Sequence, residues 1–332
     1  MVMPQGFKAF RIHEAGKTVQ ARFETLRLDD LAAGDVVIRV AWSGINYKDA
    51  LAATGKGRIL RRFPLVGGVD LAGTVVSSTD PRCQPGDRVV VTGGGLSETH
   101  DGGFSEYARV PGEWVIPLPD GLDARTAMSF GTAGFTAALA IHRLEQNGLS
   151  PDLGPVIVTG ATGGVGSFAV AMLAERGYEV TALTRKTTAG EYLKGLGAST
   201  IMPLDEVDAG TQPLKKAMWG GAIDNLGGAT LAWLTRTTVN WGSIASVGLT
   251  QGTEFNTTVL PFILRGVSVL GINAVEVPRK VRLEIWQRLA GEFRTAALGR
   301  IASREIGLDQ LIAELPAWID ATVVGRCLVR LA

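Results

Sequence analysis

The segment 156–166, which reads Val-Ile-Val-Thr-Gly-Ala-Thr-Gly-Gly-Val-Gly, constrains the fold more than any other part of the chain. An apolar run of strand length ends at Gly160, and Gly163 and Gly166 follow where a helical pattern begins. Glycines at such a turn let the backbone approach a pyrophosphate, and the free N–H groups at the helix start bind the anion. Ala161 stands where the first glycine of G-x-G-x-x-G is usually written. The segment predicts a dinucleotide-binding turn, and the alternative is a tight turn without a ligand.

From Thr126 onward, apolar runs of strand length alternate with helical patterns, which indicates a parallel sheet built from βαβ units. The expected strands are Val156–Thr159, Val180–Leu183, two segments marked by Ile201 and Ile223, Ile244–Val247 and Val267–Gly271. The expected helices are Ser167–Arg176, Gly190–Leu196 and Ala229–Thr237. Six strands with intervening helices predict a doubly wound Rossmann domain of the α/β class over residues 126–274.

The end of the second of these strands indicates which dinucleotide is bound. An NAD site normally places Asp or Glu about 20 residues after the glycines. This chain instead reads Thr184, Arg185 and Lys186. Two cations and a hydroxyl suit a 2′-phosphate, so we predict NADP(H) as the cofactor. The alternative is that Arg185 and Lys186 are solvated loop charges.

Ligands of doubly wound sheets bind at the carboxyl ends of the strands. This rule adds Asn225, Gly248, Leu249, Ile272 and Asn273 to the expected cofactor contacts. The glycine turn contributes Ala161, Thr162, Gly163, Gly164 and Val165.

Up to about residue 120 the chain consists of short β-type runs separated by Pro- and Gly-rich turns. The clearest runs are Val36–Trp42, Leu71–Ser77 and Arg88–Thr92. We interpret residues 1–125 as an irregular β-barrel domain. Residues 275–332 show helical spacing and a final strand-like run, but they are too few to form a core of their own. They are expected to complete the first domain, which makes the Rossmann domain an insertion.

Charge and the usual metal-binding residue types exclude several function classes. Thirty-three basic and thirty-two acidic residues leave a net charge of +1, so we expect neither nucleic acid nor a membrane as partner. The first residues lack a secretory pattern, and no long apolar stretch occurs, so the expected location is cytoplasmic. Two cysteines and three histidines lie far apart in the sequence, so no metal site is expected.

Two segments, Gly44–Gly57 and Pro64–Val75, carry a family resemblance. They resemble the zinc-free quinone oxidoreductase branch of the medium-chain dehydrogenase/reductase superfamily, and most closely its acryloyl-coenzyme A reductases. Further similar segments are Pro85–Val89, Gly102–Tyr107, Gly131–Ala137, Glu191–Lys194 and Leu260–Val267. Zinc-bearing relatives have a cysteine and a Gly-His-Glu where this chain has Asn46–Asp49 and Gly68–Asp70.

The resemblance implies a GroES-like barrel as the first domain, a cofactor in the cleft, and metal-free reduction of an activated carbon–carbon double bond with NADPH. It implies that Tyr47 donates to the thioester oxygen, where charge develops, or else only contacts the cofactor. Thr132 and Thr136 are expected near the nicotinamide, or as helix caps. Asn46 is placed with the substrate-binding residues, although with Asp49 it also fits a helix N-cap.

Lys56, Arg58, Arg61 and Arg62 place four cations within seven residues, with no acid among them. We expect Arg58, Arg61 and Arg62 to bind the phosphates of coenzyme A, and the alternative is a solvated loop. An NADPH:quinone or other enone reductase and a non-catalytic NADPH-binding sensor are the competing functions. The edge strand Val267–Gly271 is expected to pair with that of a second copy in a homodimer.

Overall fold

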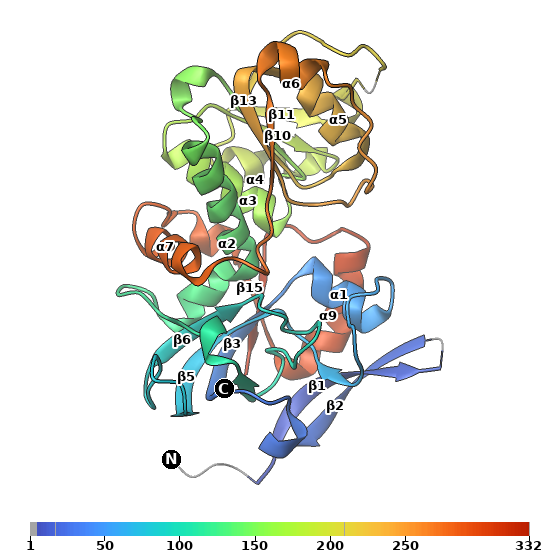
Figure 1. Cartoon of the computed structure of the whole chain (residues 1–332). Coiled ribbons are helices and arrows are strands. Elements are labelled where there is room, and N and C mark those ends of the chain that lie inside the picture. Colours follow the sequence, from blue (N-terminus) through green and yellow to red (C-terminus); the bar gives the residue numbers. More distant parts are fainter. Residues whose placement is uncertain (1–4, 17, 209, 332) are drawn as a thin grey trace. The chain divides into compact units, whose positions relative to one another are not determined.

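The computed structural model describes residues 5–16, 18–208 and 210–331, which form two compact units (Figure 1). Unit 1 comprises the described residues of 1–132, 274–290 and 298–332. Unit 2 comprises those of 133–273 and 291–297. The C-terminal part of the chain therefore returns almost entirely to the first unit.

A parallel sheet of six strands forms the centre of unit 2. Its strands lie in the order β11 (Thr200–Pro203), β10 (Val180–Thr184), β9 (Val156–Thr159), β12 (Trp219–Asp224), β13 (Thr238–Ser246) and β14 (Ser268–Gly271). This is the strand order of a dinucleotide-binding Rossmann sheet, so the predicted architecture is confirmed. The order reverses between β9 and β12, and in such sheets the ligand binds beside this reversal, at the carboxyl ends of the strands.

Helices cover both faces of this sheet, because right-handed crossovers place successive helices on opposite sides of the reversal. They are α3 (Gly164–Glu175) and α4 (Gly190–Lys194) on one face, and α5 (Gly228–Thr237) and α6 (Leu260–Arg265) on the other (Figure 1). Every residue of β9 and β10 is buried, as expected for strands covered on both sides. The sheet therefore holds the strand ends rigidly.

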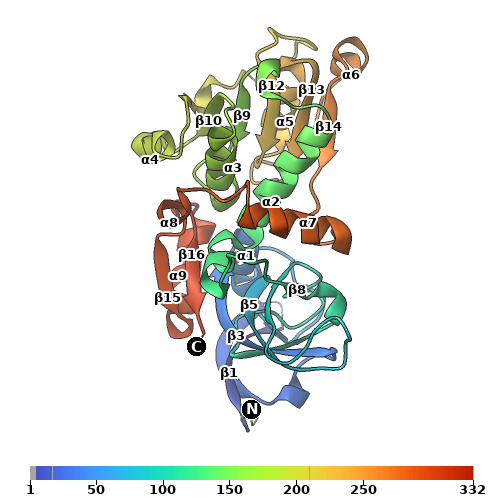
Figure 2. The same cartoon turned by 90° about the vertical axis from the view of Figure 1, so that its left-hand side faces the viewer.

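Unit 1 is rich in β-structure (Figure 2). One sheet has the order β15 (Arg304–Gly307), β16 (Cys327–Arg330), β3 (Val36–Ile45), β5 (Asp70–Ser78), β6 (Arg88–Thr92) and β8 (Ile116–Pro117), with β7 (Tyr107–Val110) also paired to β3. The second sheet has the order β2 (Thr18–Leu26), β1 (Phe7–Ala15) and β4 (Leu65–Val66). Alternate residues of β3, namely Val36, Ile38 and Val40, pack in one buried apolar cluster.

The C-terminal segment contributes both a strand and helices to unit 1. β16 pairs antiparallel with β3, with Val329 opposite Ser43. Helix α9 (Leu311–Ile319) places Leu311 and Leu315 in the same buried cluster as Ala50 of α1. The remaining helices are α1 (Tyr47–Thr54), α7 (Arg279–Ala290), α8 (Leu298–Ile301) and α2 (Ala124–Gln146), which is kinked at Gly131 and continues into unit 2.

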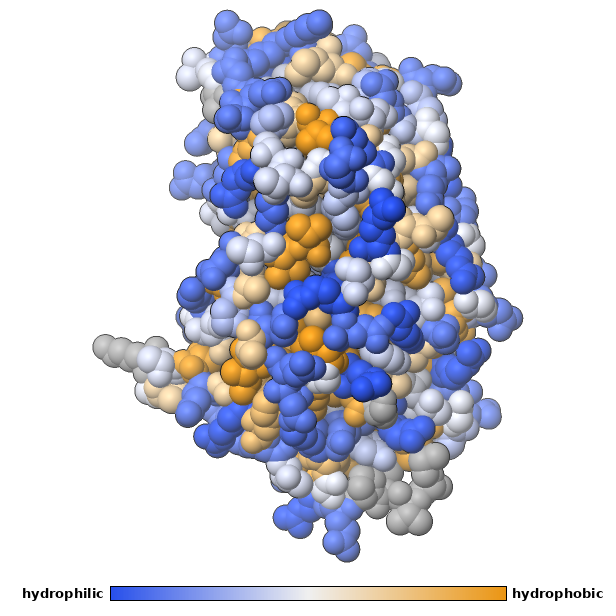
Figure 3. Space-filling model, turned by 180° about the vertical axis from the view of Figure 1, so that it is seen from behind, coloured by the Kyte–Doolittle hydropathy of each residue, from blue (hydrophilic) through white to orange (hydrophobic). Residues whose placement is uncertain are grey.

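Hydrophilic residues cover most of the molecular face seen in Figure 3, and hydrophobic residues form small patches between them. Scattered apolar groups of this kind are ordinary on protein surfaces. Among the helices of the described residues, none has the length and apolar character needed to cross a membrane.

Candidate active site

The predicted glycine turn lies between β9 and α3. Gly163 is the N-cap of α3, and Gly164 and Val165 begin the helix, where N–H groups have no partner within the helix. A Cβ atom at Gly166 would lie 2.4 Å from the carbonyl oxygen of Gly160 and 2.7 Å from the Cα atom of Ala161. Only glycine permits this close contact between helix and turn. The geometry fits the pyrophosphate of a dinucleotide at the helix N-terminus.

A buried hydrogen-bond network holds the loop after β12. Thr159 Oγ1 donates to Asp224 Oδ1 at 2.7 Å, and the backbone N–H groups of Leu226 and Gly227 donate to the same carboxylate. Burial raises the pKa of Asp224 above its ordinary value. Asn225 Nδ2 donates to the carbonyl of Thr159, whereas Asn225 Oδ1 is buried with no hydrogen-bond partner among the described residues. A ligand donor would satisfy this acceptor.

The ends of β12 and β13 approach each other at the same edge of the sheet. A Cβ atom at Gly248 would lie 2.3 Å from the carbonyl oxygen of Asn225, so glycine is required there as well. Leu249 is exposed, and the N–H group of Ile272 donates to Ser246. The other predicted cofactor residues of unit 2 include Thr136, which is buried on α2, Thr162 in the glycine turn, and Asn273 after β14.

The predicted 2′-phosphate residues lie directly after β10. Thr184 Oγ1 accepts the backbone N–H of Lys186 at 3.0 Å, which fixes the start of the turn. Burial and the positive charge of Arg185 lower the pKa of Lys186. No carboxylate of the described residues forms an ion pair with Arg185, which is exposed. Two neighbouring cations in this arrangement favour an anionic ligand.

In unit 1, α1 begins at Tyr47 with Asn46 as its N-cap. Asp49 lies in the first turn and accepts the backbone N–H of Asn46 at 2.8 Å. Gly55 ends the helix in the left-handed conformation, with φ of 69°. Tyr47 is 41% exposed, and its hydroxyl forms no hydrogen bond to any described residue. The hydroxyl is therefore available to a ligand.

A buried charge cluster adjoins Tyr47 and was not predicted from the sequence. It consists of Asn46, Asp49, Asp70 and Arg326, and both aspartates and the arginine are at most 2% exposed. Asn46 Nδ2 donates to Asp49 and Asp70 at 3.2 and 3.0 Å, and Arg326 donates to Asn46 Oδ1 at 2.7 Å. Burial and the negative charge of Asp70 raise the pKa of Asp49 to about 7. The side-chain amide of Asn46 thus donates to two aspartates and accepts from Arg326. The contact of Asn46 with substrate stays a prediction.

The same cluster holds the start of the kinked segment of α2. Asp70 Oδ2 accepts the backbone N–H of Thr132 at 2.8 Å and lies 3.6 Å from an Arg326 nitrogen. Arg326 also donates to the carbonyl of Met128. Gly131 adopts φ of 51°, and a Cβ atom there would lie 2.1 Å from Arg326. Asp70 and Arg326 thus connect the N-terminus of α1 with Thr132, a predicted nicotinamide contact.

The four cationic side chains of the loop after α1 are exposed to solvent. Lys56, Arg58, Arg61 and Arg62 are exposed, and none forms an ion pair with a described residue. The loop itself is fixed, because Leu60 is buried in the apolar cluster beneath it. The structure therefore presents unpaired cations on an ordered segment.

Side chains suited to metal binding do not gather in the described part of the chain. There, no three or more of its His, Cys, Asp and Glu residues are placed to hold a metal ion. Cys83 and Cys327 are both free and buried. The carboxylate of Asp70 accepts hydrogen bonds from the side chain of Asn46 and the backbone of Thr132.

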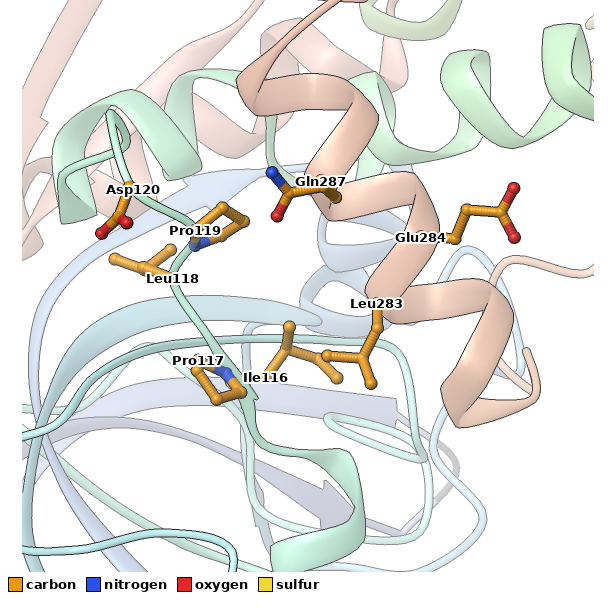
Figure 4. Close-up of a pocket in the computed structure, with 8 residues that line it drawn as sticks. All are labelled: Ile116, Pro117, Leu118, Pro119, Asp120, Leu283, Glu284 and Gln287. Carbon is orange, nitrogen blue, oxygen red and sulfur yellow. The ribbon is translucent and has the colours of Figure 1, made fainter.

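A surface groove of about 540 Å³ lies elsewhere in unit 1, between residues 116–120 and α7. Ile116 and Leu283 face each other across it (Figure 4). None of the predicted site residues lines this groove.

Sequence models of two protein families match the chain. Residues 32–120 match the family described as "Alcohol dehydrogenase GroES-like domain". Residues 164–290 match the family described as "Zinc-binding dehydrogenase". Together with the observed sheets, these matches confirm the predicted combination of a GroES-like domain with a Rossmann domain.

Two relatives are similar over nearly the full length. The protein named "Putative quinone oxidoreductase YhfP" from Bacillus subtilis is 48% identical over 326 residues, which are 98% of this chain and 99% of the relative. The protein named "Probable acrylyl-CoA reductase AcuI" from Escherichia coli is 46% identical over 315 residues, which are 95% of this chain and 96% of the relative.

Solved structures give the same result. A Salmonella enterica yhdH oxidoreductase in complex with NADP shares 44% identity at a TM-score of 0.95, over 98% of this chain and 100% of that one. Bacillus subtilis yhfP with NAD bound shares 47% identity at a TM-score of 0.96, over 99% of this chain and 100% of that one. The chain therefore belongs to the medium-chain dehydrogenase/reductase superfamily, in the branch that its motifs predicted.

Proposed function

We propose that this protein is an NADPH-dependent oxidoreductase that reduces acryloyl-coenzyme A to propanoyl-coenzyme A without a metal ion. The observation that carries the proposal is the 46% identity, over 95% of the chain, to the relative named as an acrylyl-CoA reductase. The Tyr47 hydroxyl could donate to the thioester oxygen of such a substrate, and the unpaired cations after α1 could bind its phosphates.

The charges after β10 support NADPH rather than NADH. Two similar structures contain NADP or NADPH and a third contains NAD, so the similar structures also favour the phosphorylated cofactor. Arg185 and Lys186 provide positive charge where an NAD site normally has a carboxylate. We propose that Thr184, Arg185 and Lys186 bind the 2′-phosphate, that the N-terminus of α3 binds the pyrophosphate, and that Asn225 Oδ1 accepts a cofactor N–H group.

NADPH, when bound, supplies a hydride. The β-carbon of an acryloyl thioester accepts hydride because the thioester carbonyl takes up the resulting negative charge as an enolate. A proton from solvent then adds to the α-carbon and completes the propanoyl thioester. Tyr47 is proposed to donate a hydrogen bond to that oxygen, and one positioned donor contributes about 3 kcal/mol to the barrier reduction. Asn46, Asp70 and Arg326 hold α1, and therefore Tyr47, in place.

The cations after α1 are proposed to hold the nucleotide end of coenzyme A. Arg58, Arg61 and Arg62 are exposed and unpaired among the described residues, so phosphate binding breaks no existing ion pair. Arginine binds phosphate oxygens through two parallel hydrogen bonds. Replacing these residues by alanine is expected to raise the KM for the thioester.

A turnover assay that follows NADPH absorbance tests the proposal. Acryloyl-coenzyme A, a simple quinone and no acceptor are compared at the same enzyme concentration. The proposal predicts the highest kcat/KM with acryloyl-coenzyme A. Higher kcat/KM with the quinone would instead support the second candidate, a quinone reductase, which the name of the Bacillus subtilis relative favours. Turnover with neither acceptor, despite NADPH binding, would favour a sensor.

We further propose that two copies of the chain pair through β14. This strand lies at the edge of the six-stranded sheet and is only partly buried. Unpaired edge strands readily pair with another chain. Light scattering at low protein concentration is expected to give the mass of a dimer, and the mass of a monomer would refute the pairing. A cytoplasmic location is also proposed, in agreement with two free cysteines.

The domain assignment remains a proposal of the same kind. We propose that residues 1–125, completed by 275–332, form the catalytic domain and that 126–274 form the NADP-binding domain.

A further inference from the structure

We propose that Glu98 is a positioning residue for the acyl-coenzyme A substrate, because it joins the residue next to Tyr47 to the loop that carries the cations. The Glu98 carboxylate forms an ion pair with the Lys48 ammonium group. The Glu98 carbonyl oxygen accepts the backbone N–H of Arg61 at 2.8 Å. This inference rests on the proposed function, since it assigns one residue to both ends of that substrate.

The loop that carries Glu98 is rigidly built. Three successive N–H groups, from Glu98, Thr99 and His100, donate to the carbonyl oxygen of Gly95 at 3.0–3.1 Å. Ser97 adopts φ of 59°, a conformation that non-glycine residues adopt only where the surroundings enforce it. The loop is therefore rigid, and segments that bind to it are held in place.

The base of the loop is anchored in the interior of unit 1. The His100 ring packs edge-on against Trp114, with 5.2 Å between ring centroids. The next residue, Asp101, accepts the backbone N–H groups of Ala32 and Val66 at 2.7 and 2.8 Å. Glu98 consequently cannot shift without breaking several buried contacts.

Lys48 has no role in stabilising its own helix. It is the second residue of α1, and a cation in the first turn opposes the helix dipole. The pair with Glu98 offsets this repulsion, and the Glu98 side chain is only 15% exposed. Because Lys48 directly follows Tyr47, the ion pair fixes the start of α1 against the rigid loop.

The second contact of Glu98 reaches the cation-bearing loop. The Arg61 N–H bond attaches residues 56–62 to the same rigid loop, between Arg58 and Arg62. Glu98 thereby contributes to the distance between the Tyr47 hydroxyl and the cations. Lys48 also neutralises the Glu98 carboxylate, which would otherwise repel the phosphates that we propose bind nearby.

Kinetics of Glu98→Gln and Lys48→Met test the inference with two acceptors. Acryloyl-coenzyme A has both an acyl and a nucleotide end, whereas methyl vinyl ketone has no nucleotide. If Glu98 positions the substrate, each variant should increase the KM for acryloyl-coenzyme A by a factor about ten times larger than the factor by which it increases the KM for methyl vinyl ketone. The double variant is expected to match the worse single variant, because both remove one interaction. Lys48→Arg, which can still pair with Glu98, is expected to restore the KM.

A matched control distinguishes positioning from the general effect of removing a surface ion pair. Lys8→Met removes a lysine from an exposed ion pair with Asp309 in the same unit and is expected to leave both KM values unchanged. A lower KM for acryloyl-coenzyme A in Glu98→Gln would overturn the inference, because Lys48 would then act as a further phosphate-binding cation. Equal changes for both acceptors would also overturn it. Wild-type protein without acryloyl-coenzyme A turnover would refute the proposed function itself.

Discussion

The buried carboxyl of Asp49 should make unit 1 less stable as the pH rises toward neutrality, and the variant Asp49→Asn should remove this dependence. Asp49 is 2% exposed, and burial together with the charge of Asp70 raises its pKa from 3.8 to about 7. Between these two values the folded protein binds a proton at Asp49 that the unfolded chain has lost. The contribution of Asp49 to stability is therefore greatest below pH 3.8 and falls until the pH exceeds about 7.

The size of the effect follows from the difference between the two pKa values. One pH unit corresponds to about 1.4 kcal/mol, so the shift from 3.8 to about 7 corresponds to roughly 4 kcal/mol. The amide of the variant does not ionise, and this contribution disappears. Asparagine also loses an acceptor, because Asp49 Oδ2 receives two hydrogen bonds from Asn46. That loss costs about 1–3 kcal/mol at every pH and does not alter the slope.

Urea unfolding at a series of pH values checks the prediction. The difference in unfolding free energy between Asp49→Asn and wild type should change in favour of the variant as the pH rises from about 4 to about 8. Asp29→Asn, at an exposed carboxyl of the same unit, serves as the control. Parallel pH profiles for wild type and Asp49→Asn would refute the reasoning, since they would show that Asp49 ionises equally in both states.

Three further variants test the site. Arg326→Met should destabilise the protein by about 3–5 kcal/mol in urea unfolding, because Asp70 loses its buried cation, and a loss below 1 kcal/mol would contradict this. Arg185→Ala and Lys186→Ala should each raise the KM for NADPH about tenfold while the KM for NADH stays nearly constant, and an unchanged NADPH KM would remove the 2′-phosphate assignment. Tyr47→Phe should lower kcat about 100-fold with NADPH affinity retained. Weaker NADPH binding with retained kcat would instead mean that Tyr47 only contacts the cofactor.

The strands of unit 2 were predictable because the residues of each strand, taken alone, show the apolar pattern of a buried strand. The strand at Val156–Thr159 was expected with the bounds that it has, since it is fully buried and ends at a glycine turn. The strand at Val180–Leu183 extends by one residue, to Thr184. β13 begins at Thr238, before the expected Ile244, because the exposed residues Asn240 and Trp241 interrupt the buried run in its first half. Exposure at a strand end removes the apolar pattern on which the prediction depends.

The charge cluster was beyond prediction because its members are brought together only by the fold. Asn46 and Arg326 are separated by 280 residues, and no periodicity connects them. Arg326 precedes β16, whose pairing with β3 brings Cys327 opposite Ile45. The strand register therefore places Arg326 beside Asn46. Gly131 was the one indication in the sequence of this cluster, because a side chain at that position would collide with Arg326.

The same reasoning explains why the C-terminal segment belongs with the N-terminal one. Without β16, the segment from Trp42 to Ile45 of β3 would lose its partner strand on one side, and Asp70 would be a buried carboxylate without a cation. An isolated buried charge costs several kcal/mol, which is comparable to the net stability of a domain. Residues 1–132 expressed alone should therefore fail to fold cooperatively, whereas a chain that joins them directly to residues 274–332 should unfold in one transition. Cooperative unfolding of 1–132 alone would show that the cluster contributes little to the stability of unit 1.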